Sequence, residues 1–421
     1  MRNREYFKDR KVTIVGLARS GVSCARLLAK LGAKVSVTDS QNAPATRAKR
    51  RQLHSKNIKV ELGRHSLDFI KGRDLVVVSP GVPQNAPILA WARKSGIPVL
   101  SEIEVGWILC PGRVIAVTGS NGKTTVATLI GRVLKKAGKR VVVCGNIGNS
   151  FCREVEKIRE GDFVSLEVSS FQLETVRDFK PDIAVILNLS RNHLDRHVDM
   201  QEYLAAKKLI FKNQDKDDFL VINKDDPVLK KAALDTESRV VYFRACKKLN
   251  ANQAAVMAVG SILGVKKNII LKVFKDFKGI EHRMEEVKEI KGIKFINDSK
   301  STTVGATAWA LNNIKSAAIL IAGGREKGND YSIIRSLVGR KVKEVVLIGE
   351  AREKIAKAFH GVIPIHKTAS LKDAVNLAFR RSSKNECVLF SPMCKSFDMF
   401  ANYEERGRLF KSVVRRLAKD Y

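Results

Sequence analysis

The residues that most directly indicate chemistry are 118–125, which read Thr-Gly-Ser-Asn-Gly-Lys-Thr-Thr. They follow an apolar run at residues 114–117 and precede a helical pattern that begins near Val126. A strand that ends in glycines and leads into a helix presents backbone N–H groups to an anion. In such a turn Lys123 reaches the β- and γ-phosphates of a nucleoside triphosphate, and Thr124 can bind Mg²⁺.

The spacing of this loop differs from the usual phosphate-binding pattern. In that pattern the first glycine lies five residues before the final Gly-Lys glycine, and here that position is Val117. The nearer glycine is Gly119, so the loop is a shorter Gly-x-x-Gly-Lys-Thr. This spacing indicates a narrower set of ATP-using proteins.

Polar residues also follow other apolar segments, where an open α/β sheet binds its ligands. Glu167 would face the phosphate loop and hold Mg²⁺ directly or through water. His193 alone is typical of a loop or helix cap, but beside Glu167 metal ligation is the better interpretation. The lysine-containing segments 295–303 and 322–328 suit a carboxylate or phosphate, with a charged turn as the alternative. Residues 391–400 alone look like an ordinary helix start.

Alternating strand and helix patterns divide the chain into three α/β blocks, residues 1–104, 105–285 and 286–421. We predict a Rossmann-like N-terminal domain, a central P-loop ATPase-type domain and a Rossmann-like C-terminal domain, with mostly parallel sheets. In the first block Ala18 replaces the middle glycine of the dinucleotide fingerprint, which disfavours a nicotinamide oxidoreductase. The expected strands are residues 12–15, 34–39, 74–78, 114–117, 140–144, 163–168, 183–187, 219–222, 293–296, 318–321, 345–348 and 387–390.

Composition narrows the function classes. The 421 residues include 77 Lys+Arg and 43 Asp+Glu, a formal net charge of +34, but the excess is spread along the chain and aromatics are 6%. We therefore expect no nucleic-acid partner, and a nucleic-acid-binding protein is an alternative supported by charge alone. With no apolar run long enough for a membrane span and no signal-peptide pattern, we expect a cytoplasmic protein. Seven scattered cysteines predict free thiols.

Taken in order, nine segments resemble the Mur ligases, the ATP-dependent amide-forming enzymes of peptidoglycan synthesis, over essentially the whole chain. Ser-Ser-Phe-Gln-Leu at 169–173 and Ser-Phe-Asp-x-Phe at 396–400 resemble in particular the members that add D-glutamate. The segments are Gly-Ser-Asn-Gly-Lys-Thr at 119–124, Gly-Asn-Ile-Gly at 145–148, Glu-Val-Ser-Ser-Phe-Gln-Leu at 167–173, His-Leu-Asp-Arg at 193–196, Tyr-Leu-Ala-Ala-Lys at 203–207, His-Arg at 282–283, Asn-Asp-Ser-Lys at 297–300, Gly-Gly-Arg-Glu-Lys-Gly at 323–328 and Ser-Pro-Met-Cys-Lys-Ser-Phe-Asp at 391–398.

The resemblance implies a reaction, its substrates and its cofactors. ATP would phosphorylate the alanyl carboxylate of UDP-N-acetylmuramoyl-L-alanine, and the amine of D-glutamate would attack the acyl phosphate. Such chemistry needs Mg²⁺, cations around the phosphoryl group and fixed substrates more than a protein nucleophile. We expect ATP and Mg²⁺ as cofactors and a monomeric protein.

The resemblance also implies roles for individual residues. Lys123, Lys207, His193 and Glu167 would be catalytic, with Thr124, Glu167, His193 and a carbamylated Lys207 as metal ligands. If the resemblance is set aside, Lys207 reads as a solvated helix lysine. ATP would contact Gly119, Ser120, Asn121, Gly122, Lys123, Thr124, Thr125, Asn250, Gln253, Arg283 and Asp298. The uridine nucleotide would contact Arg19, Ser20, Asp39, Ser40, Ser79, Pro80, Gly81, Asn146 and His193. D-glutamate would contact Lys300, Thr302, Lys327, Ser396 and Phe397.

Some residues depart from the family pattern. The common Asp-His-x-Asp-Arg begins with Asn192 here, the usual His-Asn is Leu249-Asn250, and the following Asn is Gln253. The segment 226–250 is also shorter than expected, so the adenine contacts are the least secure. A folylpolyglutamate synthase would lack the first block, and a ligase for a diamino acid would carry an Asp-Asn-Pro-Arg-like signature that is absent from this sequence.

Overall fold

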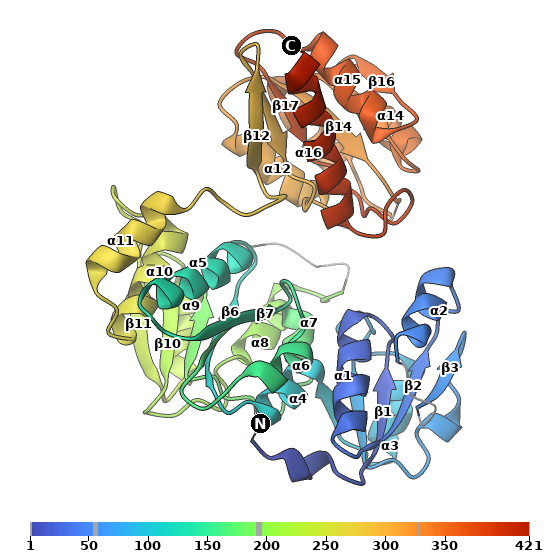
Figure 1. The fold of residues 1–421 in the computed structure, drawn as a ribbon, viewed down its shortest axis with the longest axis vertical. Coiled ribbons are helices and arrows are strands. Elements are labelled where there is room, and N and C mark those ends of the chain that lie inside the picture. Colours follow the sequence, from blue (N-terminus) through green and yellow to red (C-terminus); the bar gives the residue numbers. More distant parts are fainter. Residues whose placement is uncertain (1, 54–57, 191–195, 327, 421) are drawn as a thin grey trace. The chain divides into compact units, whose positions relative to one another are not determined.

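The computed structural model describes residues 2–53, 58–190, 196–326 and 328–420. The chain divides into two compact units, residues 1–277 and 278–421. The first unit contains two sheets and the second contains one (Figure 1). Three sheets match the three α/β blocks expected from the sequence, while the residue boundaries of those blocks stay a prediction.

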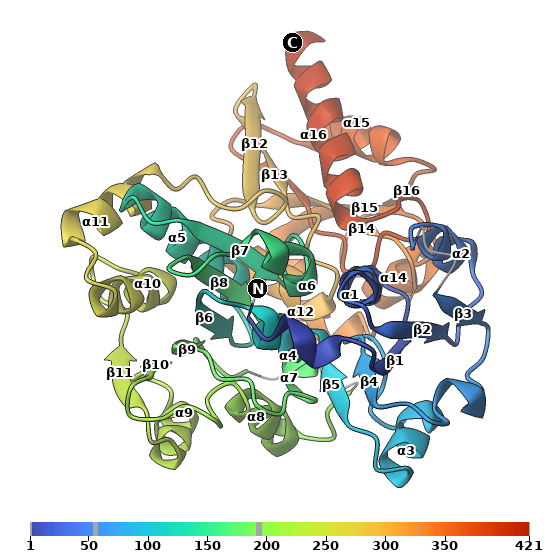
Figure 2. The ribbon, with the colours of Figure 1, turned by 60° about the horizontal axis from the view of Figure 1, so that its bottom comes forward.

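The first sheet is parallel and has the strand order β3-β2-β1-β4-β5. Its order reverses between β1 and β4, which is where ligands bind in this class of sheet. Helices α1 and α3 cover opposite faces (Figure 2). The elements are η1 (Arg4–Phe7), β1 (Lys11–Val15), α1 (Arg19–Lys30), β2 (Lys34–Asp39), α2 (Pro44–Arg51), β3 (Lys59–Leu62), η2 (Leu67–Phe69), β4 (Leu75–Val78), α3 (Pro87–Lys94), β5 (Val99–Ser101) and α4 (Glu102–Leu109).

The second sheet is also parallel, with the order β11-β10-β9-β6-β8-β7. The strand that leads into the phosphate loop, β6, lies between β8 and β9, so three strand ends meet at the loop. The elements are β6 (Arg113–Thr118), α5 (Lys123–Lys136), β7 (Val141–Gly145), α6 (Phe151–Glu154), η3 (Val155–Lys157), β8 (Phe163–Glu167), α7 (Ser170–Leu173), β9 (Ile183–Ile186), α8 (Met200–Lys208), β10 (Phe219–Asn223), α9 (Pro227–Ala232), η4 (Ala233–Asp235), β11 (Arg239–Phe243), α10 (Ala251–Ile262) and α11 (Lys267–Asp276).

Alternating side chains of β6 enter two different cores. Ile115 and Val117 pack with α5, α10 and α11 on one face of the sheet. Val114 and Ala116 point to the other face and belong to a core that also contains β1, β2 and α1 of the first sheet. The first two sheets therefore share one hydrophobic core.

The third sheet has the order β12-β13-β17-β14-β15-β16. It is parallel except for the β12–β13 pair, which is antiparallel. Helices α12–α14 pack on one face, and α15 and α16 pack on the other. The elements are β12 (Glu285–Ile290), β13 (Ile293–Asn297), α12 (Val304–Asn313), β14 (Ala318–Gly323), η5 (Ser332–Ile334), α13 (Arg335–Lys341), β15 (Val342–Ile348), α14 (Arg352–Phe359), β16 (Ile365–Lys367), α15 (Leu371–Arg381), β17 (Cys387–Phe390) and α16 (Tyr403–Asp420).

Within the described part of the chain, none of the helices is long and apolar enough to cross a membrane.

Candidate active site

The phosphate loop joins β6 to α5 and is shaped by two glycines. Gly119 has φ +147° and Gly122 has φ +84°, backbone conformations that other residues adopt only with strain. Gly122 is the N-cap of α5 and no side chain caps that helix end. The Nζ of Lys123 folds back over the loop and donates to the carbonyl oxygens of Gly119 at 2.8 Å and Ser120 at 3.0 Å. This arrangement fits a bound phosphate group.

Asn188 holds the loop in place from the end of β9. Its Oδ1 accepts from the backbone N–H of Asn121 at 2.9 Å, and its Nδ2 donates to the Asn121 carbonyl at 3.1 Å. The backbone N–H of Ser120 donates to the Asn188 carbonyl at 3.0 Å. The sequence analysis did not single out Asn188, although it follows a strand whose end was expected at the site.

Glu167 ends β8 beside the loop and is buried. Its Oε1 accepts from Nδ2 of Asn146 at 2.8 Å, whereas its Oε2 is buried without a hydrogen-bond partner among the described residues. A buried carboxylate oxygen without a donor is costly unless a cation or ligand occupies the adjoining space. This orphaned oxygen fits the expected metal-binding role of Glu167.

Lys207, on α8, is buried with 1% of its side chain exposed. Its Nζ lies 3.3 Å from the Thr118 Oγ1 and 3.2 Å from the Gly119 carbonyl, and it faces the ring of Tyr203 at 4.4 Å. Burial, together with the nearby charge of Lys123, holds the pKa of Lys207 well below its usual range. The alternative of a solvated helix lysine is wrong, because this amine is enclosed beside the phosphate loop.

The metal-binding set expected from the sequence is described only in part. Glu167, Thr124 and Lys207 lie around one end of the second sheet, whereas His193 lies outside the described residues. Among the described residues there is no cluster of three or more His, Cys, Asp or Glu side chains that would hold a metal ion. A metal held here would therefore take oxygen atoms from Glu167, the Thr124 hydroxyl and other groups.

Asn250 and Gln253, the expected adenine contacts, form a capping box at the start of α10. The Asn250 side chain accepts from the Gln253 backbone N–H at 3.0 Å, and the Gln253 side chain accepts from the Asn250 N–H at 3.1 Å. Their neighbour Asn252 lies closest to the loop, since a Cβ on Gly122 would meet its Oδ1 at 2.4 Å. The sequence analysis passed over Asn252.

A cavity of about 770 Å³ lies at the carboxyl end of the first sheet. Both carboxylate oxygens of Asp39 accept backbone N–H groups, from Leu17 at 2.6 Å and Gln41 at 2.8 Å. Asp39 therefore fixes the glycine turn as well as lining the cavity. The expected uridine contacts that line it are Asp39, Ser40, Ser79, Pro80 and Gly81, together with His65, which the sequence analysis did not identify. Arg19 lines an adjoining pocket instead, and Ser20 follows it on α1.

Arg196 ties the 79–83 loop of this cavity to the second sheet. Its guanidinium donates to the carbonyl oxygens of Pro80 at 2.5 Å and Val82 at 2.9 Å, and to the carboxylate of Glu174 at 3.2 Å. It also stacks on Phe171, with its Cζ 4.2 Å from the ring centre. One side chain therefore joins two loops of the first unit.

In the second unit the expected ligand residues lie on loops that follow adjacent strands. Asp298, Lys300 and Thr302 follow β13, and Ser396 and Phe397 follow β17, which pairs with β13. Ser396 is buried and Phe397 is 57% exposed. Arg283 precedes β12 at the edge of the same sheet, and Lys327 lies outside the described residues.

Arg406, on α16, holds these loops together, and the sequence analysis did not identify it. It is 1% exposed, and its guanidinium donates to Ser299 Oγ at 3.1 Å, the Ser299 carbonyl at 2.9 Å and the Cys394 carbonyl at 3.1 Å. Desolvation by burial lowers its pKa to about 10, which leaves it charged near neutral pH. It therefore fixes the spacing between the loops that follow β13 and β17.

Models of known families match three consecutive segments of the chain. They are described as "Mur ligase MurD-like, N-terminal domain" for residues 10–101, "Mur ligase middle domain" for 117–279 and "Mur ligase, glutamate ligase domain" for 282–394. A UDP-N-acetylmuramoylalanine–D-glutamate ligase of Koribacter versatilis is 39% identical over 447 aligned residues, which cover 98% of each chain. The chain belongs to the Mur ligase family. Other relatives of 36% to 40% identity carry the same name.

Solved structures of Mur ligases share the fold. UDP-N-acetylmuramate-alanine ligase from Thermotoga maritima matches with a TM-score of 0.61 at 18% identity, over 98% of this chain and all of that one. The MurF ligase of the same organism, in complex with ADP, matches with a TM-score of 0.60 at 16% identity, over 99% of this chain and 98% of that one. The expected three-domain α/β architecture is confirmed.

Family membership makes the chain an ATP-dependent ligase that forms amide bonds, as the sequence analysis expected. The glycine loop, Lys123 and the surrounding strand ends lie where such an enzyme needs them. The roles of individual residues stay predictions.

We expect Asp298→Asn to flatten the pH dependence of this Mur ligase's stability. Burial raises the pKa of Asp298 from 3.8 to about 6, although hydrogen bonds from Ser301, Ser391 and the Met284 N–H oppose the shift. The folded state therefore keeps the Asp298 proton up to a higher pH than the unfolded state does. The contribution of Asp298 to the free energy of unfolding is highest below about pH 4 and falls by up to about 3 kcal/mol as the pH rises through about 6.

The fall should be seen in urea unfolding of the wild type between about pH 4.5 and pH 7.5. It should be smaller in Asp298→Asn, and some of it should remain because burial also raises the pKa of Glu102 to about 6. Asp276→Asn, at an exposed position at the end of α11, is the control and should follow the wild type. A pH profile of Asp298→Asn parallel to that of the wild type would contradict the assigned pKa.

Proposed function

We propose that the chain joins D-glutamate to the alanyl carboxylate of UDP-N-acetylmuramoyl-L-alanine, using ATP and Mg²⁺. The observation that carries this specificity is the near-complete alignment with relatives named for that reaction. The amide-forming chemistry is supported by a phosphate loop that lies beside a buried carboxylate and a buried amine. Because both ATP and the nucleotide-linked substrate are made in the cytoplasm, we propose that location.

In the first half-reaction an oxygen of the alanyl carboxylate attacks the γ-phosphorus of ATP, and ADP leaves. Lys123 and the N–H groups of residues 119–125 would hold the phosphates, and the charge of Lys123 would stabilise the transferring group. Thr124 and Glu167, with His193, would hold Mg²⁺, which neutralises phosphate charge and orients the phosphoryl oxygens. Asn250, Gln253, Arg283 and Asp298 would hold the rest of the nucleotide.

In the second half-reaction the amine of D-glutamate attacks the acyl carbon, loses a proton and displaces phosphate. Lys300, Thr302, Lys327, Ser396 and Phe397 would hold D-glutamate, with the lysines binding its carboxylates. The cavity lined by Asp39, Ser40, Ser79, Pro80 and Gly81 would hold the uridine nucleotide, with Arg19, Ser20, Asn146 and His193 toward its diphosphate and sugar. Binding in these positions would hold the acyl phosphate and the amine next to each other, and this proximity would supply most of the rate enhancement.

Lys207 would act as a carbamate. Its neutral amine would attack CO₂, forming an N–C bond and releasing a proton, and the new carboxylate would bind a second cation. The lowered pKa supports this step because only the unprotonated amine is nucleophilic. The proposed carboxylate would also place a negative charge near the ammonium group of Lys123.

The deciding experiment is phosphate release from ATP with UDP-N-acetylmuramoyl-L-alanine and one amino acid at a time. Release that requires both the nucleotide and D-glutamate is expected. L-glutamate, meso-diaminopimelate and no amino acid should give background rates. Release with another amino acid would keep the ligase chemistry and overturn the proposed specificity, and no release with any amino acid would overturn both.

We expect Arg196→Ala to raise KM for the uridine nucleotide by about 10- to 100-fold, because the variant loses two or more charge-assisted hydrogen bonds that hold the 79–83 loop. The 79–83 loop would lose its anchor to Glu174, while the phosphate loop would be untouched, so kcat should change by less than about threefold. Initial rates against nucleotide concentration give both constants. Arg177→Ala removes an exposed arginine nearby and is the control. A fall in kcat at constant KM would contradict a positioning role.

A further inference from the structure

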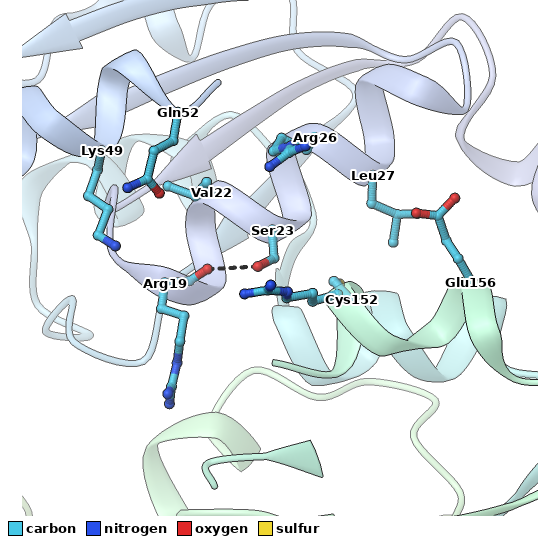
Figure 3. Close-up of a pocket in the computed structure, with 10 residues that line it drawn as sticks. Arg19, Val22, Ser23, Arg26, Leu27, Lys49, Gln52, Cys152 and Glu156 are labelled. Atoms are coloured by element: carbon cyan, nitrogen blue, oxygen red, sulfur yellow. Dashed lines mark hydrogen bonds between the residues drawn. The ribbon is translucent and has the colours of Figure 1, made fainter. Parts of the chain in front are cut away.

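A second pocket of about 510 Å³ lies beside α1 and adjoins the proposed substrate cavity. It is formed by α1, the end of α2 and α6 with the turn that follows it. Figure 3 shows the α1 side chains in the middle, with Lys49 and Gln52 on one side and Cys152 and Glu156 on the other. Its lining shares no residue with the 770 Å³ cavity. Of its lining residues, the proposed reaction uses Arg19 alone.

Four cationic side chains from three helices surround this pocket: Arg19, Arg26, Lys49 and Arg153. Within the described residues, none of the four is in a salt bridge. The pocket's acidic residue, Glu156, accepts from Lys30 at 2.5 Å, so its charge is already matched by a lysine outside the pocket. The concave surface thus carries a net positive charge, with Glu156 as the one carboxylate in its described lining and Glu102 buried near Arg19.

The floor of the pocket is apolar, in contrast to its cationic rim. Val22, Leu27 and Cys152 are buried there, and the Cys152 Sγ is turned to the Glu102 carbonyl at 3.4 Å. The amide of Gln52 offers a neutral hydrogen-bond donor, whereas the hydroxyl of Ser23 already donates to the Arg19 carbonyl at 2.9 Å. A cationic rim over an apolar floor, in a cavity of small-molecule size, suits a compact anion that carries several charges better than it suits a flat polymer surface.

We propose that this pocket, here called the α1 pocket, binds a small molecule that bears two or more phosphate groups. Arginine forks and a lysine ammonium on three sides would each bind phosphate oxygens through charge-assisted hydrogen bonds. The inference does not depend on the reaction proposed above. Arg19 opens α1 and directly follows Ala18 of the substrate cavity, so an anion in the α1 pocket would also draw Arg19 away from the uridine nucleotide.

The test is a calorimetric titration of the full chain with inorganic pyrophosphate, without Mg²⁺ and with saturating UMP and AMP, which carry one phosphate each, to occupy the proposed substrate and ATP sites. Binding to the wild type is expected to persist under these conditions. The double variant Arg26→Gln/Lys49→Gln should weaken it at least about 10-fold, through the loss of two charged donors. Neither residue belongs to the proposed reaction machinery.

The matched control is Arg50→Gln/Arg51→Gln, which removes the same charge from the exposed end of α2 outside the pocket. It should bind pyrophosphate within about twofold of the wild type. Equal losses in both double variants would show a general charge effect and overturn the α1 pocket, as would the absence of binding to the wild type. Anomalous scattering from tungstate soaked into crystals locates the anion: a peak among Lys49, Arg26 and Arg153 supports the proposal, and peaks elsewhere alone overturn it.

Discussion

Replacing Lys123 with alanine is expected to reduce ATP-dependent phosphate release by about 10³-fold or more, the scale of losing a cation that stabilises a transferring phosphoryl group. The Nζ of Lys123 lies 2.8 Å from the Gly119 carbonyl, directly over the loop that would hold the phosphates. Among the described residues, the nearby amine of Lys207 is buried and its pKa is lowered, so it would not replace the charge of Lys123. Steady-state phosphate release gives kcat, and the apparent ATP affinity is measured separately.

The control for this substitution is Lys136→Ala, at the other end of the same helix and exposed. It should keep wild-type activity, and both variants should melt within a few degrees of the wild type. An active Lys123→Ala variant would remove the phosphate loop from the mechanism and would direct attention to another ATP site.

The second large effect is expected at Lys207. Lys207→Ala should lower kcat by about 10²- to 10³-fold, because a ligand to a catalytic cation would be lost. Removing dissolved CO₂ should lower wild-type activity reversibly, since the carbamate would revert to the amine. The carbamate carbon should give its own signal in ¹³C NMR after the wild type is equilibrated with ¹³C-bicarbonate, and Lys207→Ala should lack that signal.

Lys208→Ala is the control, because this neighbouring lysine points to Asp235 on the surface. It should keep activity, CO₂ dependence and the NMR signal. The lowered pKa sets the direction in which carbamate formation changes with pH. The amine of Lys207 is neutral at lower pH than an ordinary lysine, so carbamate should form near neutral pH. A wild-type enzyme that is fully active without CO₂ and gives no ¹³C signal would contradict carbamylation, while Lys123 would still be tested independently.

The sequence predicted the parts of the site that depend on strand ends. In a parallel sheet all carboxyl ends lie on one edge, so polar residues directly after β6, β8 and β9 had to converge. Glu167 ends one such strand and Asn188 comes shortly after another, and the structure brings both to the phosphate loop, although the sequence analysis singled out Glu167 alone. The strands themselves were evident because they are buried on both faces and read as continuous apolar runs.

The sequence did not predict the residues that bond to partners far away along the chain. Arg406 is 107 residues from Ser299, and Arg196 is 116 from Pro80, so no local pattern links either pair. The missed strands β3, β5, β11, β12 and β16 are short or lie at sheet edges, where exposed side chains weaken the apolar signal. In β12 the Glu-Glu-Val-Lys-Glu-Ile sequence is mostly charged.

Helix α4 determines which parts of the chain should unfold together. Its Glu104 accepts the backbone N–H groups of Arg177, Asp178 and Phe179 at 2.8, 3.0 and 3.1 Å, and its apolar residues lie in the core that the first two sheets share. Residues 1–277 should therefore melt in a single cooperative transition, and residues 278–421 in another. A chain cut after residue 277 would keep its core whole, whereas a cut near residue 104 would leave an apolar face of each half open to aggregation.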